Sequence, residues 1–229
     1  MQEAEIKQIK EDYRTREAYR SLRTNIEFTG ADKKVIAITS CIPNEGKSSI
    51  AFNLSRSLAE SGKKVLFIDA DLRKSVLTSR YKVTGEVKGL SHFLSGQAKA
   101  ADVMYALKNE KMVVIFAGVT PPNPAELLSS SNFKRLIDSA REVYDYIIID
   151  TPPMGSVIDA AIVAQQCDGS VLVIASNEVS SKFAKNVVEQ LEKADCPILG
   201  AVLNKVNMTS NKYYGKYYGK YYGKYGNEE

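Results

Sequence analysis

An alternation between short apolar, β-branched runs and longer amphipathic stretches constrains the fold of this chain more than any other feature. The runs lie at 35–39, 65–68, 112–116, 146–149, 171–174 and 198–203. Helical stretches are expected at 48–61, 124–143, 156–166 and 180–195. Strands that are apolar on both faces are typical of a parallel sheet with helices packed on each side. The pattern therefore predicts a doubly wound, mostly parallel α/β sheet.

Composition narrows the class of protein. The 229 residues are 44% hydrophobic and 25% charged, which is enough for one large α/β domain. The net charge of +4 is too small to indicate a nucleic-acid-binding protein. No apolar run approaches the roughly 18 residues that span a bilayer, and the first residues lack the apolar core of a secretion signal. Three cysteines, an odd number, suit a reducing cytosol better than a disulfide framework.

Three parts are expected along the chain. Residues 1–30 are predicted to be a helical segment, because 1–28 are polar without Gly or Pro and Tyr19, Leu22 and Ile26 follow helical spacing. Residues 31–207 are predicted to form the α/β domain, with short helices and loops over 75–110. From 208 to 229 the chain is expected to be a flexible tail, because Lys-Tyr-Tyr-Gly units starting at 212, 216 and 220 offer no aliphatic side chains for a core.

The strongest chemical signal follows the first predicted strand. A tight loop ends in Gly46-Lys47-Ser48 and leads into a helix, which is the context of a phosphate-binding P-loop. Backbone N–H groups would bind phosphate oxygens, Lys47 would reach the terminal phosphates and the Ser48 hydroxyl would ligate Mg²⁺. Cys41 stands where the first glycine of the motif is usual, and we interpret it as a small loop residue. The predicted nucleotide-binding residues of the loop are Pro43, Asn44, Glu45, Gly46, Lys47, Ser48 and Ser49.

Acidic residues follow two further predicted strands. Asp69 and Asp71 come after 65–68, with Arg73 beyond them, and Asp150 comes after 146–149. A single aspartate at a strand end is often only a turn former or a helix N-cap. Ligands of doubly wound sheets gather at the carboxyl ends of the strands, however, so three acids beside a P-loop predict one site. Asp150 is placed as a Walker B carboxylate, close to Mg²⁺ or its water shell.

The base of the nucleotide is expected to be adenine. Asn204 to Asn207, after the last predicted strand, nearly matches the guanine-binding sequence Asn-Lys-x-Asp. Asn207 replaces the aspartate that would accept hydrogen bonds from guanine, so guanine is disfavoured. Asn204 is a candidate contact for the adenine ring.

The combination of motifs resembles the bacterial tyrosine kinases (BY-kinases) of capsule and exopolysaccharide operons. The resemblance covers the chain from about residue 10 to the end. It rests on Glu-Ala-Tyr-Arg-Ser-Leu-Arg-Thr-Asn at 17–25, the P-loop, Phe-Ile-Asp-Ala-Asp-Leu-Arg at 67–73, Ile-Ile-Asp-Thr-Pro-Pro at 148–153 and the Tyr-rich tail. It implies a P-loop ATPase fold of the MinD/ParA type and a protein-tyrosine kinase that uses ATP and Mg²⁺. By this resemblance Lys47 and Ser48 hold phosphate and metal, and Asp71 and Asp150 serve the metal. Arg73 contributes to the nucleotide site, and Asp69 is the candidate general base for the tyrosine hydroxyl.

The resemblance also implies an assembly. A Glu-x-x-Arg-x-x-Arg motif, here Glu17, Arg20 and Arg23, builds a ring in that family, whereas by themselves these residues would be interpreted as a solvated face with weak ion pairs. In that family the C-terminal tail of one subunit enters the active site of a neighbouring subunit. The resemblance therefore implies autophosphorylation at Tyr213, Tyr214, Tyr217, Tyr218, Tyr221, Tyr222 and Tyr225. Further implied partners are a membrane polysaccharide co-polymerase that activates the kinase and a cognate phosphotyrosine phosphatase. The resemblance thus implies a cytoplasmic protein that reaches the inner face of the membrane only by binding its activator.

Alternatives remain open from the residues themselves. The tail could stack on single-stranded nucleic acid or form a self-associating segment. The domain could be a MinD/ParA-type regulatory ATPase or a nucleotide-gated adaptor without kinase activity. MinD/ParA proteins carry a second lysine early in the P-loop where this chain has Ile42, and they have no need of a Tyr-rich tail, so the kinase is favoured.

Overall fold

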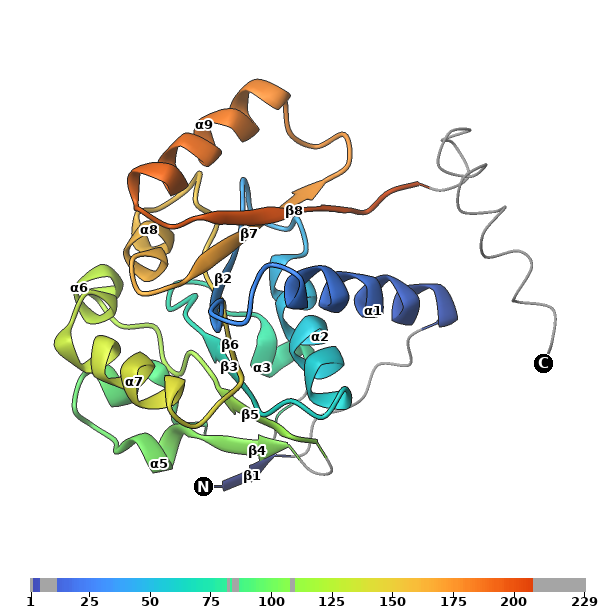
Figure 1. Ribbon diagram of the computed structural model, residues 1–229. Helices are drawn as coiled ribbons and strands as arrows, with labels where there is room; N and C mark the ends of the chain where they lie inside the picture. The colour runs from blue at the N-terminus through green and yellow to red at the C-terminus, as the bar shows by residue number, and fades with distance from the viewer. Residues whose placement is uncertain (1, 5–11, 82, 84–86, 108–109, 208–229) are drawn as a thin grey trace.

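The computed structural model describes residues 2–4, 12–81, 83, 87–107 and 110–207. One eight-stranded sheet runs through them in the order β1-β4-β5-β3-β6-β2-β7-β8, shown in Figure 1. All neighbouring strands are parallel except the antiparallel pair β4 and β5. The strands are β1 (Gln2–Ala4), β2 (Val35–Ser40), β3 (Val65–Asp69), β4 (Tyr105–Leu107), β5 (Met112–Ile115), β6 (Tyr146–Asp150), β7 (Gly169–Ala175) and β8 (Ile198–Asn204). The predicted doubly wound, mostly parallel sheet is confirmed.

Helices cover both faces of this sheet. They are α1 (Tyr13–Glu27), α2 (Lys47–Glu60), α3 (Leu77–Arg80), α4 (Leu90–Leu94), α5 (Ala100–Val103), α6 (Pro124–Leu128), α7 (Ser131–Arg141), α8 (Asp159–Ala164) and α9 (Ser181–Lys193).

The central strands are buried on both faces, as their continuous apolar character predicts. On β6, Ile148 packs in the core that includes Phe52 of α2, whereas its neighbours Ile147 and Ile149 pack in the core that includes Phe133 of α7. Side chains of successive strand residues point to opposite faces, so each strand contributes to both cores. This two-sided burial holds the strand ends, and the loops that follow them, in fixed positions.

Several elements differ from the sequence expectation. The expected helix over 124–143 is two helices, because Ser130 accepts a hydrogen bond from the N–H of Phe133 and caps a second helix. The stretch 75–110 contains the predicted short helices but also β4, which pairs with β5 and lengthens the sheet. Gln2–Ala4, expected to be helical, form β1 along the free edge of β4, since open strand edges favour pairing over local helix propensity.

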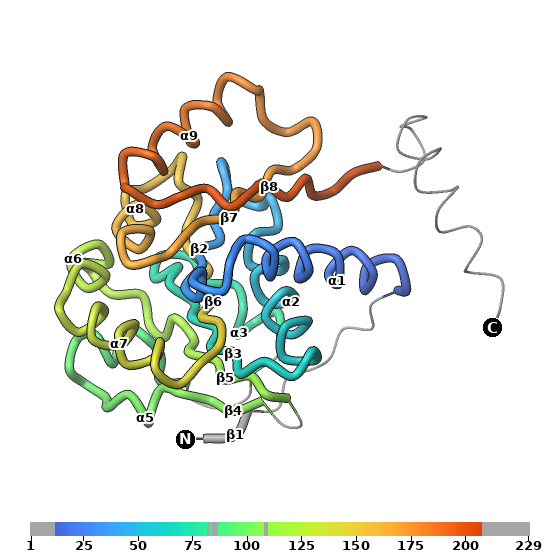
Figure 2. The backbone as a smooth tube through the Cα atoms, in the orientation of Figure 1, coloured from blue at the N-terminus to red at the C-terminus, as the bar shows by residue number. Residues whose placement is uncertain are grey.

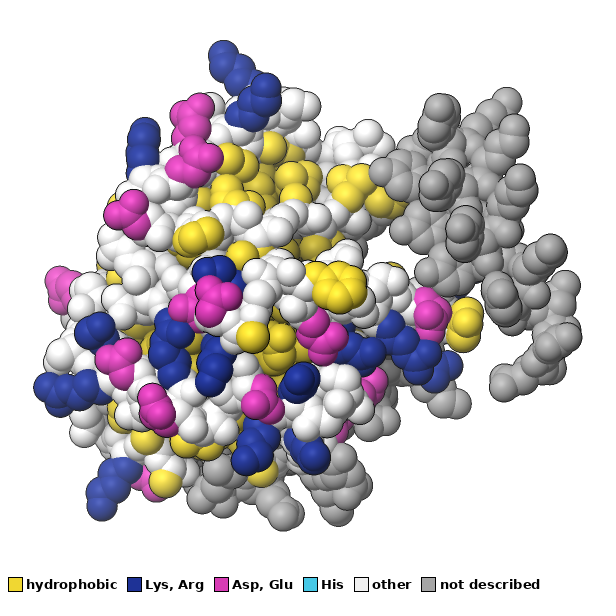
Figure 3. Space-filling model, viewed as in Figure 1, with side chains coloured by type: hydrophobic (Ala, Val, Ile, Leu, Met, Phe, Trp, Pro, Cys, Tyr) yellow, Lys and Arg dark blue, Asp and Glu magenta, His cyan; other side chains and the backbone are white. Residues whose placement is uncertain are grey.

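The N-terminal helix α1 packs on α2 as an outer layer, and the two lie side by side in Figures 1 and 2. Ile26 is buried, and Tyr19 and Leu22 pack against the same core, in agreement with their helical spacing. Among the described strands, β8 at the far margin of the sheet has β7 as its one neighbour. Its Leu203 is half exposed, and Figure 3 shows apolar side chains on this part of the surface. Among the described residues, no helix combines the length and apolar character required to cross a bilayer. The predicted tail, 208–229, lies outside the described residues.

Candidate active site

The P-loop joins the carboxyl end of β2 to the first turn of α2, at the centre of the sheet. Gly46 is the N-cap residue of α2 and has a φ of +94°, in the left-handed region. A Cβ atom at this position would collide with the side-chain nitrogen of Asn204, so glycine is required for both backbone and packing reasons. Pro43 and Asn44 are exposed, whereas Lys47 and Ser48 are buried. The loop therefore presents backbone N–H groups and a lysine at the start of a helix, where anions bind.

Two carboxyl groups meet the lysine of this loop, one from the turn after β3 and one from the last residue of β6. Lys47 Nζ lies 3.2 Å from Asp71 Oδ2 and 3.6 Å from Asp150 Oδ1. Asp69 and Asp150 are register partners in the β3–β6 pair, so their side chains leave the same edge of the sheet. The structure thus brings together the lysine and the three acids that the sequence indicated, all of them nearly or fully buried.

Burial dominates the electrostatics of this cluster. It raises the pKa of Asp69 to about 8, with the nearby charge of Asp150 as the second cause. Burial likewise raises the pKa of Asp150. It opposes the charged form of Lys47, but the carboxylates of Asp150 and Asp71 outweigh it, so the pKa of Lys47 is raised. The site therefore keeps a charged lysine close to two acids, Asp69 and Asp150, whose burial opposes ionisation.

The donor set fits Mg²⁺. Asp150 Oδ1 is buried and has no hydrogen-bond partner among the described residues, and Lys47 Nζ also donates to the Ser48 hydroxyl at 3.1 Å. Hydroxyl and carboxylate oxygens are the ligands that Mg²⁺ prefers, and this ion is usually held by one or two carboxylates together with substrate phosphates. Within the described ranges no group of three or more His, Cys, Asp and Glu side chains is placed to hold a metal ion. The residues present suit a metal that arrives with a nucleotide.

Asp69 accepts two hydrogen bonds from the turn that follows β3. Its Oδ1 accepts a hydrogen bond from the N–H of Asp71 at 3.2 Å, and its Oδ2 accepts one from the hydroxyl of Ser75. These two bonds hold the turn that follows β3. Ser75 was not singled out by sequence reasoning, since a serine six residues after an aspartate carries no recognisable signal.

Other predicted nucleotide-binding residues are engaged within the protein. Arg73 forms a bidentate ion pair with Asp159, Nε to Oδ2 at 2.7 Å and Nη2 to Oδ1 at 2.9 Å. The Ser49 hydroxyl accepts a hydrogen bond from Arg80. Asn204 donates its side-chain N–H to the backbone carbonyl of Glu45 at 2.8 Å. Sequence reasoning missed Asp159, because an aspartate at the first position of a helix usually only stabilises the helix N-terminus.

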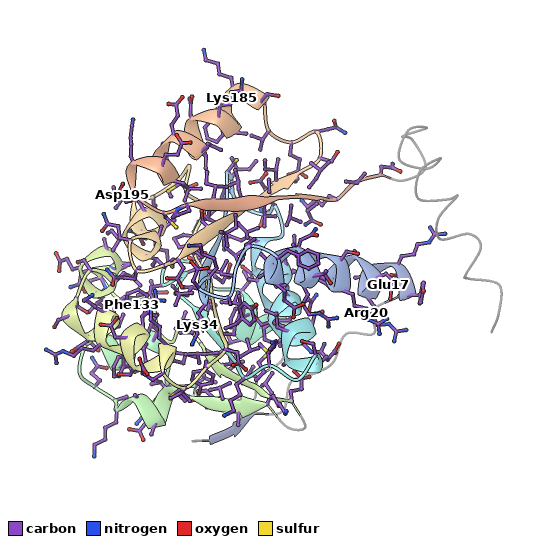
Figure 4. All side chains as sticks on the ribbon, in the orientation of Figure 1. Glu17, Arg20, Lys34, Phe133, Lys185 and Asp195 are labelled. Carbon is purple, nitrogen blue, oxygen red and sulfur yellow. The ribbon has the colours of Figure 1, made fainter. Side chains whose placement is uncertain are left out.

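The residues expected to build a ring make contacts within their own chain. Arg20 pairs with Glu17 on the same helix at 2.5 Å, and Figure 4 shows both labelled side chains on the outer part of α1. Arg23 instead donates from Nη1 to the carbonyl of Ser57 at 2.9 Å and joins α1 to the last turn of α2.

Comparisons with known proteins agree with this architecture. Residues 33–197 match the family model described as "AAA domain". The chain is 42% identical over 205 residues to "Tyrosine-protein kinase CpsD" of Streptococcus agalactiae, and the match covers 90% of each chain. Among solved structures, "The kinase domain of Escherichia coli tyrosine kinase ETK" is similar with a TM-score of 0.77 and 34% identity, covering 84% of this chain and 77% of that one. The cell division ATPase MinD of Pyrococcus furiosus is similar with a TM-score of 0.64 and 27% identity, covering 75% and 71% of the two chains.

Proposed function

The chain belongs to the AAA-domain proteins and, among them, to the bacterial tyrosine-protein kinases, and we propose that it transfers the terminal phosphate of ATP to tyrosines in the C-terminal tails of neighbouring subunits. By this modification it regulates the polymerisation and export of capsular or extracellular polysaccharide. The observation that supports the proposal is the cluster of Lys47 with Asp71 and Asp150 at the end of a P-loop.

In this proposal the chain's own residues position the phosphates. The loop from Pro43 to Ser49 surrounds them with backbone N–H groups, and Lys47 neutralises the charge that shifts during transfer. When bound, Mg²⁺ supplies charge neutralisation between the phosphates, held by Ser48, Asp71 and Asp150. Adenine is the expected base. The amide oxygen of Asn204 remains a candidate acceptor for its amino group, because the amide nitrogen is directed to Glu45.

Asp69 is the proposed general base. A phenol has a pKa of about 10, so only about 0.1% of tyrosine is ionised at neutral pH. A carboxyl group with a pKa of about 8 is a better match for this proton than an ordinary aspartate. Asp69 is the register partner of Asp150, at the edge of the sheet where the phosphates are expected.

Assembly brings the acceptor tyrosines to this site. We propose a three-part chain: an N-terminal segment, 1–30, that associates through Glu17, Arg20 and Arg23; a kinase domain, 31–207; and a substrate tail, 208–229. Arg20 is more than half exposed and needs only to exchange Glu17 of its own helix for that of a neighbour. The proposed location is the cytoplasmic face of the membrane, through contact with a polysaccharide co-polymerase activator. A cognate phosphatase would reverse the modification.

Two complementary full-length variants test transfer between subunits. One carries Lys47→Met and keeps its tail tyrosines; the other keeps Lys47 and has the seven tail tyrosines replaced by Phe. Each is prepared with the activator's cytoplasmic segment and Mg-ATP, alone and mixed. We expect phosphotyrosine only in the mixture and only on the Lys47→Met chain, as read by mass spectrometry. Release of phosphate without phosphotyrosine in the wild-type sample would contradict the kinase and favour a regulatory ATPase of the MinD type.

A further inference from the structure

Glu45 is a buried acid inside the phosphate loop, and its side chain is bonded to backbone groups of the protein itself. It is fully buried, yet within the described part of the chain no Lys, Arg or His forms an ion pair with it. Both of its oxygens accept hydrogen bonds from the backbone: Oε2 from the N–H of Ile42 at 2.8 Å and Oε1 from the N–H of Ala175 at 2.9 Å. Burying a carboxylate without a counter-charge is costly unless hydrogen bonds satisfy it, so these two bonds account for its position.

The two bonds connect the loop to itself and to the sheet. Ile42 lies three residues before Glu45, so the first bond closes a ring within the loop. Ala175 is the last residue of β7, so the second bond fastens this ring to a strand that is buried on both sides. The backbone carbonyl of Glu45 is held in addition by Asn204, the last residue of β8 and the register partner of Ala175. One residue of the loop is thus fixed to the ends of two adjacent strands.

This attachment matters because the loop has an unfavourable backbone. Asn44 and Gly46, on either side of Glu45, have φ values of +67° and +94°. Such left-handed residues direct successive N–H groups into a concave surface that binds anions, and they persist only where the surroundings hold them. A loop without its attachment would lose the concave arrangement before any phosphate arrived.

We infer that Glu45 is a positioning residue, which holds the P-loop in its phosphate-binding shape through Ile42 and Ala175, and that Asn204 assists it through the carbonyl of Glu45. The inference rests on the proposed nucleotide site. It assigns Glu45 no contact with nucleotide or metal through its side chain, since that side chain is fully buried and both of its oxygens accept hydrogen bonds from the backbone. Because it concerns phosphate binding, it is tested without any measurement of kinase activity.

The first test is Glu45→Gln in the full-length chain. The amide has nearly the same shape, but it offers one acceptor oxygen and turns an NH₂ group toward the other backbone N–H. We expect the affinity for ADP, measured by isothermal titration calorimetry, to fall about 10- to 100-fold, as the loss of one such bond predicts. The fall should be the same in EDTA and in Mg²⁺. Asp150→Asn is the matched control, and it should lower affinity only when Mg²⁺ is present.

The second test separates the loop from the base and does not depend on the buried variant folding. Asn204→Ala changes a side chain that is only partly buried, and its ligand is inorganic tripolyphosphate, which has no base. We expect several-fold weaker binding of tripolyphosphate as well as of ATP. Unchanged tripolyphosphate binding by Asn204→Ala would overturn the assisting role. A folded Glu45→Gln protein with wild-type ADP affinity, or with a loss confined to Mg²⁺, would overturn the positioning role. Neither of these two results would contradict the proposed kinase function, because the experiments measure ligand binding and not phosphate transfer.

Discussion

Replacing Asp69 by asparagine should make the nucleotide-free protein more stable while abolishing phosphotyrosine formation. Asp69 is fully buried, and burial together with Asp150 raises its pKa from 3.8 to about 8. An asparagine can preserve both contacts, because its oxygen accepts from the N–H of Asp71 and its NH₂ group donates to the hydroxyl of Ser75, which in the wild-type protein is the donor. The substitution therefore removes a carboxyl group that has to take up a proton when the protein folds at pH 7, and it leaves the turn after β3 intact.

The size of the effect follows from the pKa. One pKa unit corresponds to about 1.4 kcal/mol, so at pH 7 the raised pKa of Asp69 costs the folded state at most on the order of 4 kcal/mol. The favourable charge of Lys47 is already included in that pKa. Because the new amide is itself a buried polar group with a desolvation cost, we expect Asp69→Asn to raise the free energy of unfolding by roughly 1–3 kcal/mol. For a domain of this size that is an increase in Tm of about 3–10 °C.

The sign of the pH dependence gives a sharper test. Between pH 4 and 8 the native state retains the Asp69 proton that the unfolded chain has released, so wild-type stability falls as pH rises. The stability difference between Asp69→Asn and wild type should therefore be small near pH 4, grow through pH 5 to 7 and level off above pH 8.

The measurement is urea unfolding in EDTA without nucleotide, followed by circular dichroism. Asp168→Asn is the control, because Asp168 accepts hydrogen bonds from two backbone N–H groups and pairs with Arg141 at 2.8 Å. Its loss should destabilise the protein. The reasoning is refuted if Asp69→Asn is no more stable than wild type at pH 7, or if the difference does not change with pH.

Two further predictions concern the surroundings of the site. In a double-mutant cycle of Arg73→Leu and Asp159→Asn, urea unfolding should give a coupling energy of about 1–3 kcal/mol, in the lower part of that range because the Arg73 side chain is 40% exposed. Arg73→Leu should lower the free energy of unfolding more than Asp159→Asn does, because it leaves a buried carboxylate unpaired. If the effects of the two single substitutions simply add in the double mutant, the ion pair does not stabilise the protein. Burial, with the charge of Glu45, raises the pKa of Cys41 to about 11, so at pH 8 this thiol is almost wholly protonated. Iodoacetamide should label Cys41 far more slowly in the native protein than in urea, as followed by mass spectrometry; equal rates would show that the thiol is accessible.

Much of the fold follows from local sequence. The β-branched runs predicted the six parallel strands within one or two residues, because a strand buried on both faces must be apolar at every position. β4 and β1 were not predicted. They are three residues long and exist because the edge of β5, and then the edge of β4, offers unpaired backbone groups. No local pattern records such pairing.

The candidate site also has one part that local sequence predicts and another part that it does not. The positions of the phosphate loop and the acids follow from local sequence, because a glycine-lysine-serine turn after one strand and aspartates after two others must share one edge of a parallel sheet. The contacts of each side chain, in contrast, depend on the packed fold. Arg73 pairs with an aspartate 86 residues away, and Glu45 is held by residues 130 and 159 positions further along the chain. Contacts over such separations depend on how the strands are ordered in the sheet, and strand order is a property of the packed molecule rather than of any segment within it.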